Sequence, residues 1–220
     1  GKVIGIDLAE TMLQLTTIDI ENQGIENAQV CNMDAEALPF PDASFDFAIY
    51  GFALYEFYDL APALSEAFRV LKSNGVFASS LWGRNIDTRW DSFRNVVKSY
   101  RGQLKPVPEG GNLPRLREPA DIEAVLSKAG FANIQTVVEE KEFYFKDVAE
   151  WWGFEWSHGN RFLWERMEPP VLERCRGDLF EVVGQMKQEL GIPIVFQILL
   201  TRAEKSQIKG DLRLTPAGVS

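Results

Sequence analysis

Short apolar strands alternate with helices in the first half of the chain, and this alternation restricts the possible folds more than any other feature. Apolar runs predict four strands, over residues 3–6, 27–31, 45–50 and 76–82. Helical spacing predicts helices that start near Glu10 and at Leu60, the second with Asp59 as its cap and Asn74-Gly75 as its end. Such alternation is typical of right-handed βαβ units and a mostly parallel sheet.

The second half of the chain adds helices and two longer strands. We expect helices over 88–100 and 119–129, a loop over 103–119, and strands over 134–145 and 192–201. The last two strands lack a crossover helix of the earlier kind, so they predict an antiparallel pair at the sheet edge. The stretch between them ends in a helix with one apolar face, made of Val171, Cys175, Leu179, Val182, Met186 and Leu190.

These elements predict an α/β, Rossmann-like fold with a mostly parallel sheet, an antiparallel edge strand and a helical lid between the last two strands. The predicted domains are a core of residues 1–146 and 191–205, an insertion of residues 147–190 and a tail of residues 206–220. Because residues 2–6 already have the character of a buried strand, we expect further residues before Gly1; a tag remnant before an unusual start is the alternative.

Composition excludes several functional classes. The 220 residues carry a net charge of −9, which disfavours binding to nucleic acid or to anionic membrane surfaces. One histidine and two cysteines are too few for most His-ligated or Cys-rich metal sites, so we expect no metal. No apolar run reaches the roughly 20 residues of a membrane span and no signal peptide is visible, so we expect a cytoplasmic protein with free thiols.

Ligands of parallel α/β sheets bind at the carboxyl ends of the strands, where two aspartates occur. Asp7 could accept both hydroxyls of a ribose, or it could cap the following helix. Leu8 and Met12 could flank an adenine, or they could belong to the core. Asp34 ends the next strand, where its carboxylate could accept the adenine amino group while the backbone of Ala35 meets a ring nitrogen.

The order of these motifs resembles the class I S-adenosylmethionine-dependent methyltransferases, in the small-molecule branch that includes the ubiquinone and menaquinone C-methyltransferases. The resemblance rests on Gly5-Ile6-Asp7, on the run Asp34-Ala35-Glu36-Ala37-Leu38-Pro39-Phe40, and on the run from Glu66 to Gly75. It covers residues 1–82 well and returns weakly at 126–131. It implies S-adenosylmethionine as cofactor and S-adenosylhomocysteine as product.

The resemblance assigns cofactor-binding roles to particular residues. It makes Asp7 the ribose-binding acid, with Leu8 and Met12 beside the adenine and Asp34 and Ala35 at the adenine edge. It places Tyr50 to Phe52 beneath the methionine part of the cofactor.

Two departures from the family pattern stand out. The glycine-rich loop and the first strand of the family are missing upstream of Asp7, and no Gly-x-Gly-x-Gly occurs anywhere in the chain. Where many relatives carry a histidine pair, this chain has Leu54-Tyr55-Glu56-Phe57.

Methyl transfer mainly requires that donor and acceptor are aligned and water is excluded, with a general base where the acceptor loses a proton. The candidate bases are Tyr55, Glu56 and His158. Alternatively, Tyr55 is a packing residue at the rim of the site, Glu56 is a solvated carboxylate, and His158 is structural or solvated. Trp82, Trp152 and Trp156 could form an apolar pocket for a flat or hydrophobic acceptor, or they could join the insertion to the sheet.

The sequence therefore predicts a methyltransferase that acts on a small, apolar or aromatic molecule, with an oligomer possible. A non-catalytic, partner-binding protein of the same fold is the alternative, because the glycine-rich loop is missing. An enzyme of nucleotide-sugar or NAD chemistry would leave the loop from Asp34 to Phe40 unexplained.

Overall fold

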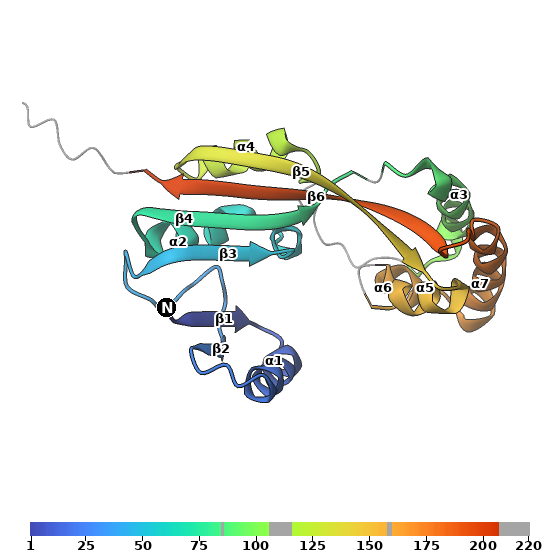
Figure 1. Cartoon of the computed structure of the whole chain (residues 1–220), viewed down its shortest axis with the longest axis horizontal. Helices are drawn as coiled ribbons and strands as arrows, with labels where there is room; N and C mark the ends of the chain where they lie inside the picture. Colours follow the sequence, from blue (N-terminus) through green and yellow to red (C-terminus); the bar gives the residue numbers. More distant parts are fainter. Residues whose placement is uncertain (85, 106–115, 158–159, 207–220) are drawn as a thin grey trace, which may run out of the picture. The chain divides into compact units, whose positions relative to one another are not determined.

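The computed structural model describes residues 1–84, 86–105, 116–157 and 160–206. They form two compact units, which we name by their main content (Figure 1). The sheet unit comprises residues 1–81, 116–137 and 200–206, and the helical unit comprises residues 82–84, 86–105, 138–157 and 160–199. The predicted loop over 103–119 and the predicted tail lie mostly outside the described residues.

The sheet unit begins with a β–α–β module. Strand β1 (Val3–Asp7) pairs in parallel with β2 (Ala28–Asn32), and α1 (Glu10–Asn22) connects them. No residue of α1 is fully buried, and the apolar Met12, Leu15 and Ile18 are each more than half exposed. This module therefore buries little apolar surface by itself.

A separate four-stranded sheet has the order β3-β4-β6-β5. Its strands are β3 (Phe45–Gly51), β4 (Leu71–Trp82), β5 (Phe131–Phe145) and β6 (Ile192–Lys205). β3 and β4 are parallel, whereas β6 and its neighbour β5 at the sheet edge run in opposite directions (Figure 1). The predicted α/β architecture, mostly parallel with an antiparallel edge, is confirmed.

Helices α2 (Leu60–Val70) and α4 (Pro119–Lys128) pack on each other, and Phe68 of α2 packs on Phe131 of β5 with ring centroids 5.2 Å apart. The predicted cap is present, because the Asp59 carboxylate accepts a hydrogen bond from Ala61 N at 2.9 Å. The predicted helix end is wrong. The helix ends at Val70, since Leu71 already pairs with Phe45 of β3.

The helical unit contains α3 (Asp91–Tyr100), α5 (Val148–Glu155), α6 (Arg161–Trp164) and α7 (Pro169–Gly184), with short 3₁₀ turns at Thr88–Trp90 and Arg101–Gln103. The sheet unit has a further 3₁₀ turn at Leu54–Glu56. Trp151 and Trp164 are fully buried in the helical unit, with Cys175, Leu179 and Val183 of α7 around them. The apolar face predicted to extend to Leu190 is wrong at that end, because the helix stops at Gly184 and Leu190 is 73% exposed.

Candidate functional site

A cavity of about 430 Å³ lies between β1 and β3 in the sheet unit. Consecutive residues of each strand line it, Ile4 to Asp7 on one side and Phe47 to Gly51 on the other. Successive side chains of a strand point to opposite faces, so only a backbone edge presents consecutive residues to one space. The cavity therefore runs along two open strand edges and reaches their carboxyl ends at Asp7 and Gly51.

Asp7 stands at the carboxyl end of β1. One carboxylate oxygen, Oδ1, accepts a hydrogen bond from Ala9 N at 2.8 Å, and the other has no partner among the described residues. The capping alternative is wrong, since α1 begins at Glu10 with Ala9 in the cap position and no side-chain cap. Leu8 and Met12 are 66% and 51% exposed, so neither belongs to the core.

The loop that links β2 to β3 carries the second predicted acid. Asp34 Oδ1 accepts a hydrogen bond from Glu36 N at 2.8 Å, which fixes a tight turn and leaves the second oxygen without a partner in the described structure. Ala35, Leu38 and Phe40 of the same loop line the cavity. Each aspartate thus uses one oxygen for the local backbone and has one for a ligand.

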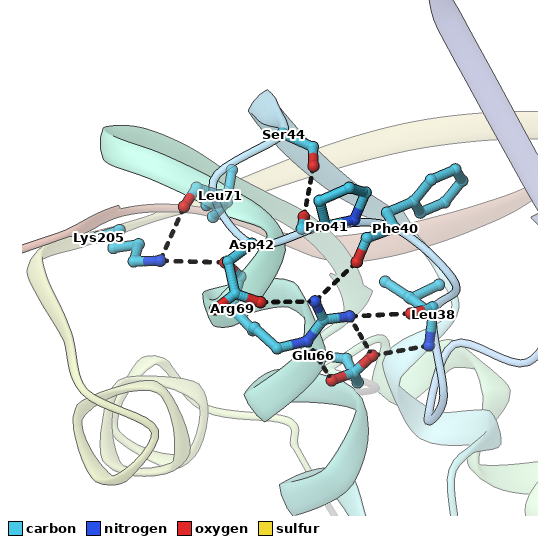
Figure 2. Close-up of polar contacts among 9 residues, drawn as sticks. All are labelled: Leu38, Phe40, Pro41, Asp42, Ser44, Glu66, Arg69, Leu71 and Lys205. Atoms are coloured by element: carbon cyan, nitrogen blue, oxygen red, sulfur yellow. Dashed lines mark hydrogen bonds and ion pairs between the residues drawn. The ribbon is translucent and has the colours of Figure 1, made fainter.

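Arg69 and Glu66 of α2 hold this loop, and we name this pair the loop clamp (Figure 2). Glu66 accepts hydrogen bonds from Leu38 N at 2.7 Å and from two guanidinium nitrogens of Arg69 at 2.7 and 2.8 Å. Hydrogen bonds from Arg69 hold the pKa of the Glu66 carboxyl below its usual range. The pair therefore stays ionised under ordinary conditions. The sequence signal for it is a Glu–Arg spacing of three within a helix.

The carboxyl end of β3 shows burial and backbone strain. The Tyr50 hydroxyl donates to Ala63 O at 3.3 Å, and burial raises the pKa of this phenol to about 12. Phe52 has a positive φ of 51°, which is rare for a residue with a bulky side chain, and its N–H donates to Ser80 O at 3.0 Å. Strained residues of this kind concentrate at functional sites.

The predicted catalytic residues lie just beyond this strand end. Tyr55 is half-buried and Glu56 is exposed within the turn Leu54–Glu56, and neither lines the cavity described above. His158 lies outside the described residues. The geometry therefore leaves all three assignments as predictions.

The three predicted acceptor-binding tryptophans belong to the helical unit. Trp152 packs on Trp156 and on Trp164, with ring centroids 6.0 and 5.3 Å apart. Trp82 is 42% exposed and packs on Phe196 at 5.1 Å. Trp152 and Trp156 thus contribute to the packing of the helical unit, and their role toward an acceptor stays a prediction.

Two further properties follow from the described residues. No group of three or more His, Cys, Asp or Glu side chains among them is placed to hold a metal ion. No helix in the described part of the chain has the length and apolar character needed to cross a membrane.

Comparison with known proteins bears on the segment that builds the cavity. Residues 1–79 match the family described as "Methyltransferase domain". This segment is similar to a methyltransferase domain. It contains β1, α1, β2, β3 and α2, and therefore both predicted aspartates and the loop clamp. The resemblance inferred from the sequence motifs is confirmed.

Individual relatives agree with this assignment. The chain is 33% identical over 117 residues to a malonyl-[acyl-carrier protein] O-methyltransferase of Geobacter sulfurreducens, covering 52% of this chain and 42% of that protein. It is 37% identical over 110 residues to a demethylmenaquinone methyltransferase of Listeria welshimeri, covering 49% of this chain and 44% of that protein. It is 27% identical over 151 residues to the uncharacterized methyltransferase YcgJ of Bacillus subtilis, covering 68% of this chain and 51% of that protein.

The chain thus spans about half, or less, of the curated relatives it matches. The crystal structure of YcgJ from Bacillus subtilis superimposes with a TM-score of 0.58 at 22% identity, covering 94% of this chain and 83% of that one. This likeness confirms the predicted fold.

The residues present fit the adenosine part of S-adenosylmethionine. The carboxyl end of the cavity carries Asp7, whose second carboxylate oxygen can accept from ribose hydroxyls. No lysine or arginine lines it among the described residues, so the anionic methionine carboxylate finds no cationic partner there.

Proposed function

We propose that this chain is the adenosine-binding part of a methyltransferase that uses S-adenosylmethionine and a small-molecule acceptor. The observation that carries the proposal is the carboxyl end of the cavity. There an aspartate with one unpaired oxygen and the start of the loop from Asp34 to Phe40 lie within a segment that matches a methyltransferase domain. The quinone and malonyl-carrier relatives support an acceptor that is small or has a small reacting part.

Each polar group has a defined task in this proposal. Asp7 binds the two ribose hydroxyls with its unpaired carboxylate oxygen, and Asp34 accepts from the adenine amino group. The Ala35 backbone N–H donates to a ring nitrogen. Tyr50 acts as a neutral phenol because its pKa of about 12 keeps the proton on oxygen at physiological pH.

The cofactor supplies an electrophilic methyl group, and the chain positions it and excludes water. Tyr55, Glu56 and His158 remain the proposed bases for an acceptor that loses a proton. Trp82, Trp152 and Trp156 remain the proposed contacts for an apolar or aromatic acceptor. The two cysteines are free thiols, which agrees with the proposed cytoplasmic location.

We also propose that an additional strand occupies the space between β1 and β3. Both strands have one unpaired backbone edge, and the two edges line one cavity. Exposed apolar strand edges promote aggregation unless another strand or element covers them. A strand from a segment before Gly1 fits the apolar lining, and the turn after it would supply N–H groups for the methionine carboxylate.

A non-catalytic role in partner binding is the second candidate. The lack of a cationic group in the described cavity lining favours it. Cofactor affinity separates the two functions, because a partner-binding protein has no need for the adenosine contacts.

The test is calorimetric titration of the 220-residue chain with S-adenosylhomocysteine. We expect micromolar affinity, loss of binding in Asp7→Ala, and at least tenfold weaker binding in Asp7→Asn, which keeps an acceptor for Ala9 N. Asp19→Asn, an exposed aspartate of α1, is the matched control and should bind like the wild type. Equal affinity of wild type and Asp7→Ala contradicts the assignment.

The strand proposal has its own measurement. Hydrogen exchange of the β1 and β3 amides is compared between the 220-residue chain and the full polypeptide encoded by its gene. We expect slower exchange in the longer polypeptide, because a new strand pairs with these edges. Equal exchange, or a reading frame with no strand before Gly1, refutes the strand position.

A further inference from the structure

The loop clamp uses every donor that an arginine offers. A guanidinium has five N–H groups in a planar fork. In Arg69, Nε donates to Glu66 Oε1 at 2.7 Å, Nη1 donates to Phe40 O at 2.7 Å and Asp42 Oδ1 at 2.8 Å, and Nη2 donates to Leu38 O at 2.9 Å and Glu66 Oε2 at 2.8 Å (Figure 2). The five donors thus meet five acceptors.

The acceptors are concentrated on the loop between β2 and β3. Both polar backbone groups of Leu38 are held, its N–H by Glu66 at 2.7 Å and its carbonyl by Arg69. The backbone of Arg69 takes part as well, because its carbonyl accepts from Ala43 N at 3.1 Å and from Lys205 Nζ at 3.2 Å. One residue of α2 therefore fixes the loop through side chain and main chain.

The clamp lies behind the proposed ligand contacts and does not form them. Arg69 and Glu66 do not line the cavity, whereas Ala35, Leu38 and Phe40 of the clamped loop do. The side chains of Arg69 and Glu66 are only 30% and 19% exposed, so water is a poor substitute for the hydrogen bonds between these two residues. A shift of Leu38 would move the neighbouring turn that presents Asp34 and Ala35.

We propose that Glu66 and Arg69 are positioning residues that set how the loop from Asp34 to Phe40 reads the adenine edge of the cofactor. This inference rests on the proposed function. Lysine cannot replace Arg69, because an ammonium group has three donors and no planar fork to serve five acceptors.

The test compares two ligands that differ only at the adenine edge. S-inosylhomocysteine carries an oxo group in place of the 6-amino group of S-adenosylhomocysteine, so the proposed contact with the Asp34 carboxylate loses its donor. We expect the wild type to prefer S-adenosylhomocysteine by roughly tenfold or more, the worth of one hydrogen bond to a charged acceptor. A residue that only supports folding would weaken both ligands equally.

The variants are Arg69→Lys and the milder Glu66→Gln, which keeps an acceptor for Leu38 N. We expect the preference to fall about tenfold in Arg69→Lys and less in Glu66→Gln. In an Asp34→Asn background, Arg69→Lys should change the preference no further, because both changes act on the same contact. Lys72→Gln removes an exposed 2.9 Å ion pair with Asp46 away from the loop and serves as the control.

The outcomes separate the two proposals. If the wild type binds S-adenosylhomocysteine but both clamp variants keep the full preference, the positioning role is overturned and the proposed function stands. If Arg69→Lys weakens both ligands by the same factor, the role is structural and the inference is overturned. If the wild type binds neither ligand, the proposed function fails and the inference fails with it.

Discussion

Glu155 at the end of α5 allows a quantitative test of the helical unit. Glu155 is only 3% exposed, and its Oε2 accepts a hydrogen bond from Asn160 Nδ2 at 2.8 Å. Burial is the largest influence and raises the pKa of this carboxyl to about 7. We predict that Glu155→Gln removes a pH-dependent loss of stability.

The direction of this pH dependence follows from the number of protons that the folded and the unfolded chain bind. Below about pH 4.5 the Glu155 carboxyl is protonated in both the folded and the unfolded chain, and its stabilising contribution is complete. Between about pH 4.5 and 7 only the folded chain holds the proton, so the free energy of unfolding falls by about 1.4 kcal/mol per pH unit. The total loss is about 3 kcal/mol, present in full above pH 7.

Urea unfolding followed by tryptophan fluorescence measures this loss. All six tryptophans lie between residues 82 and 164, in the helical unit, so the signal reports that unit alone. We expect the unfolding free energy of Glu155→Gln minus that of the wild type to rise from near zero at pH 4.5 to about 3 kcal/mol at pH 8. Glu189→Gln, at an exposed glutamate, should show no such rise. Parallel pH profiles of wild type and Glu155→Gln would refute the reasoning.

Two further predictions concern a glycine and a thiol of the helical unit. Gly191→Ala should lower the unfolding free energy by about 2–4 kcal/mol, because φ is +125° and a Cβ would lie 2.3 Å from Phe145 O. Gly24→Ala, at φ +64° with open space around the Cβ position, should lower it by about 1 kcal/mol. Equal losses of the two variants in urea unfolding would contradict this prediction. Cys175 is fully buried, and burial raises the pKa of its thiol to about 11. Ellman's reagent should therefore label Cys175 only as the helical unit opens, and the Cys31→Ser variant should have no fast-reacting thiol. A rapid reaction in that variant would show that Cys175 is accessible.

Local patterns predicted the parts of the fold that depend on neighbouring residues. The strand that ends at Asp7 and the cap at Asp59 each follow from residues a few positions apart, and the structure contains both. The end of α2 could not be predicted in this way. Helical spacing continues to Leu71, but pairing of Leu71 with Phe45 outweighs it.

The loop clamp could not be predicted from spacing alone. Arg69 reaches acceptors at Leu38 and Phe40, 31 and 29 residues away, and nothing local marks these carbonyls as needing a donor. The face of α7 was predicted better, because Val171, Val182 and Met186 pack against the core of the helical unit. Leu190 does not, since the helix ends at Gly184 and this residue is 73% exposed.

The strand order has a consequence for synthesis of the chain. Of the described strands, β6 is made after both of its neighbours, yet it lies between β4 and β5 in the sheet. Until Ile192–Lys205 has been made, β4 and β5 each present an unpaired edge, and the nascent chain exposes a ready template for intermolecular pairing. Yield in cells should therefore depend on chaperone capacity during translation of β6, and ribosomes that stall before residue 192 should leave aggregation-prone products.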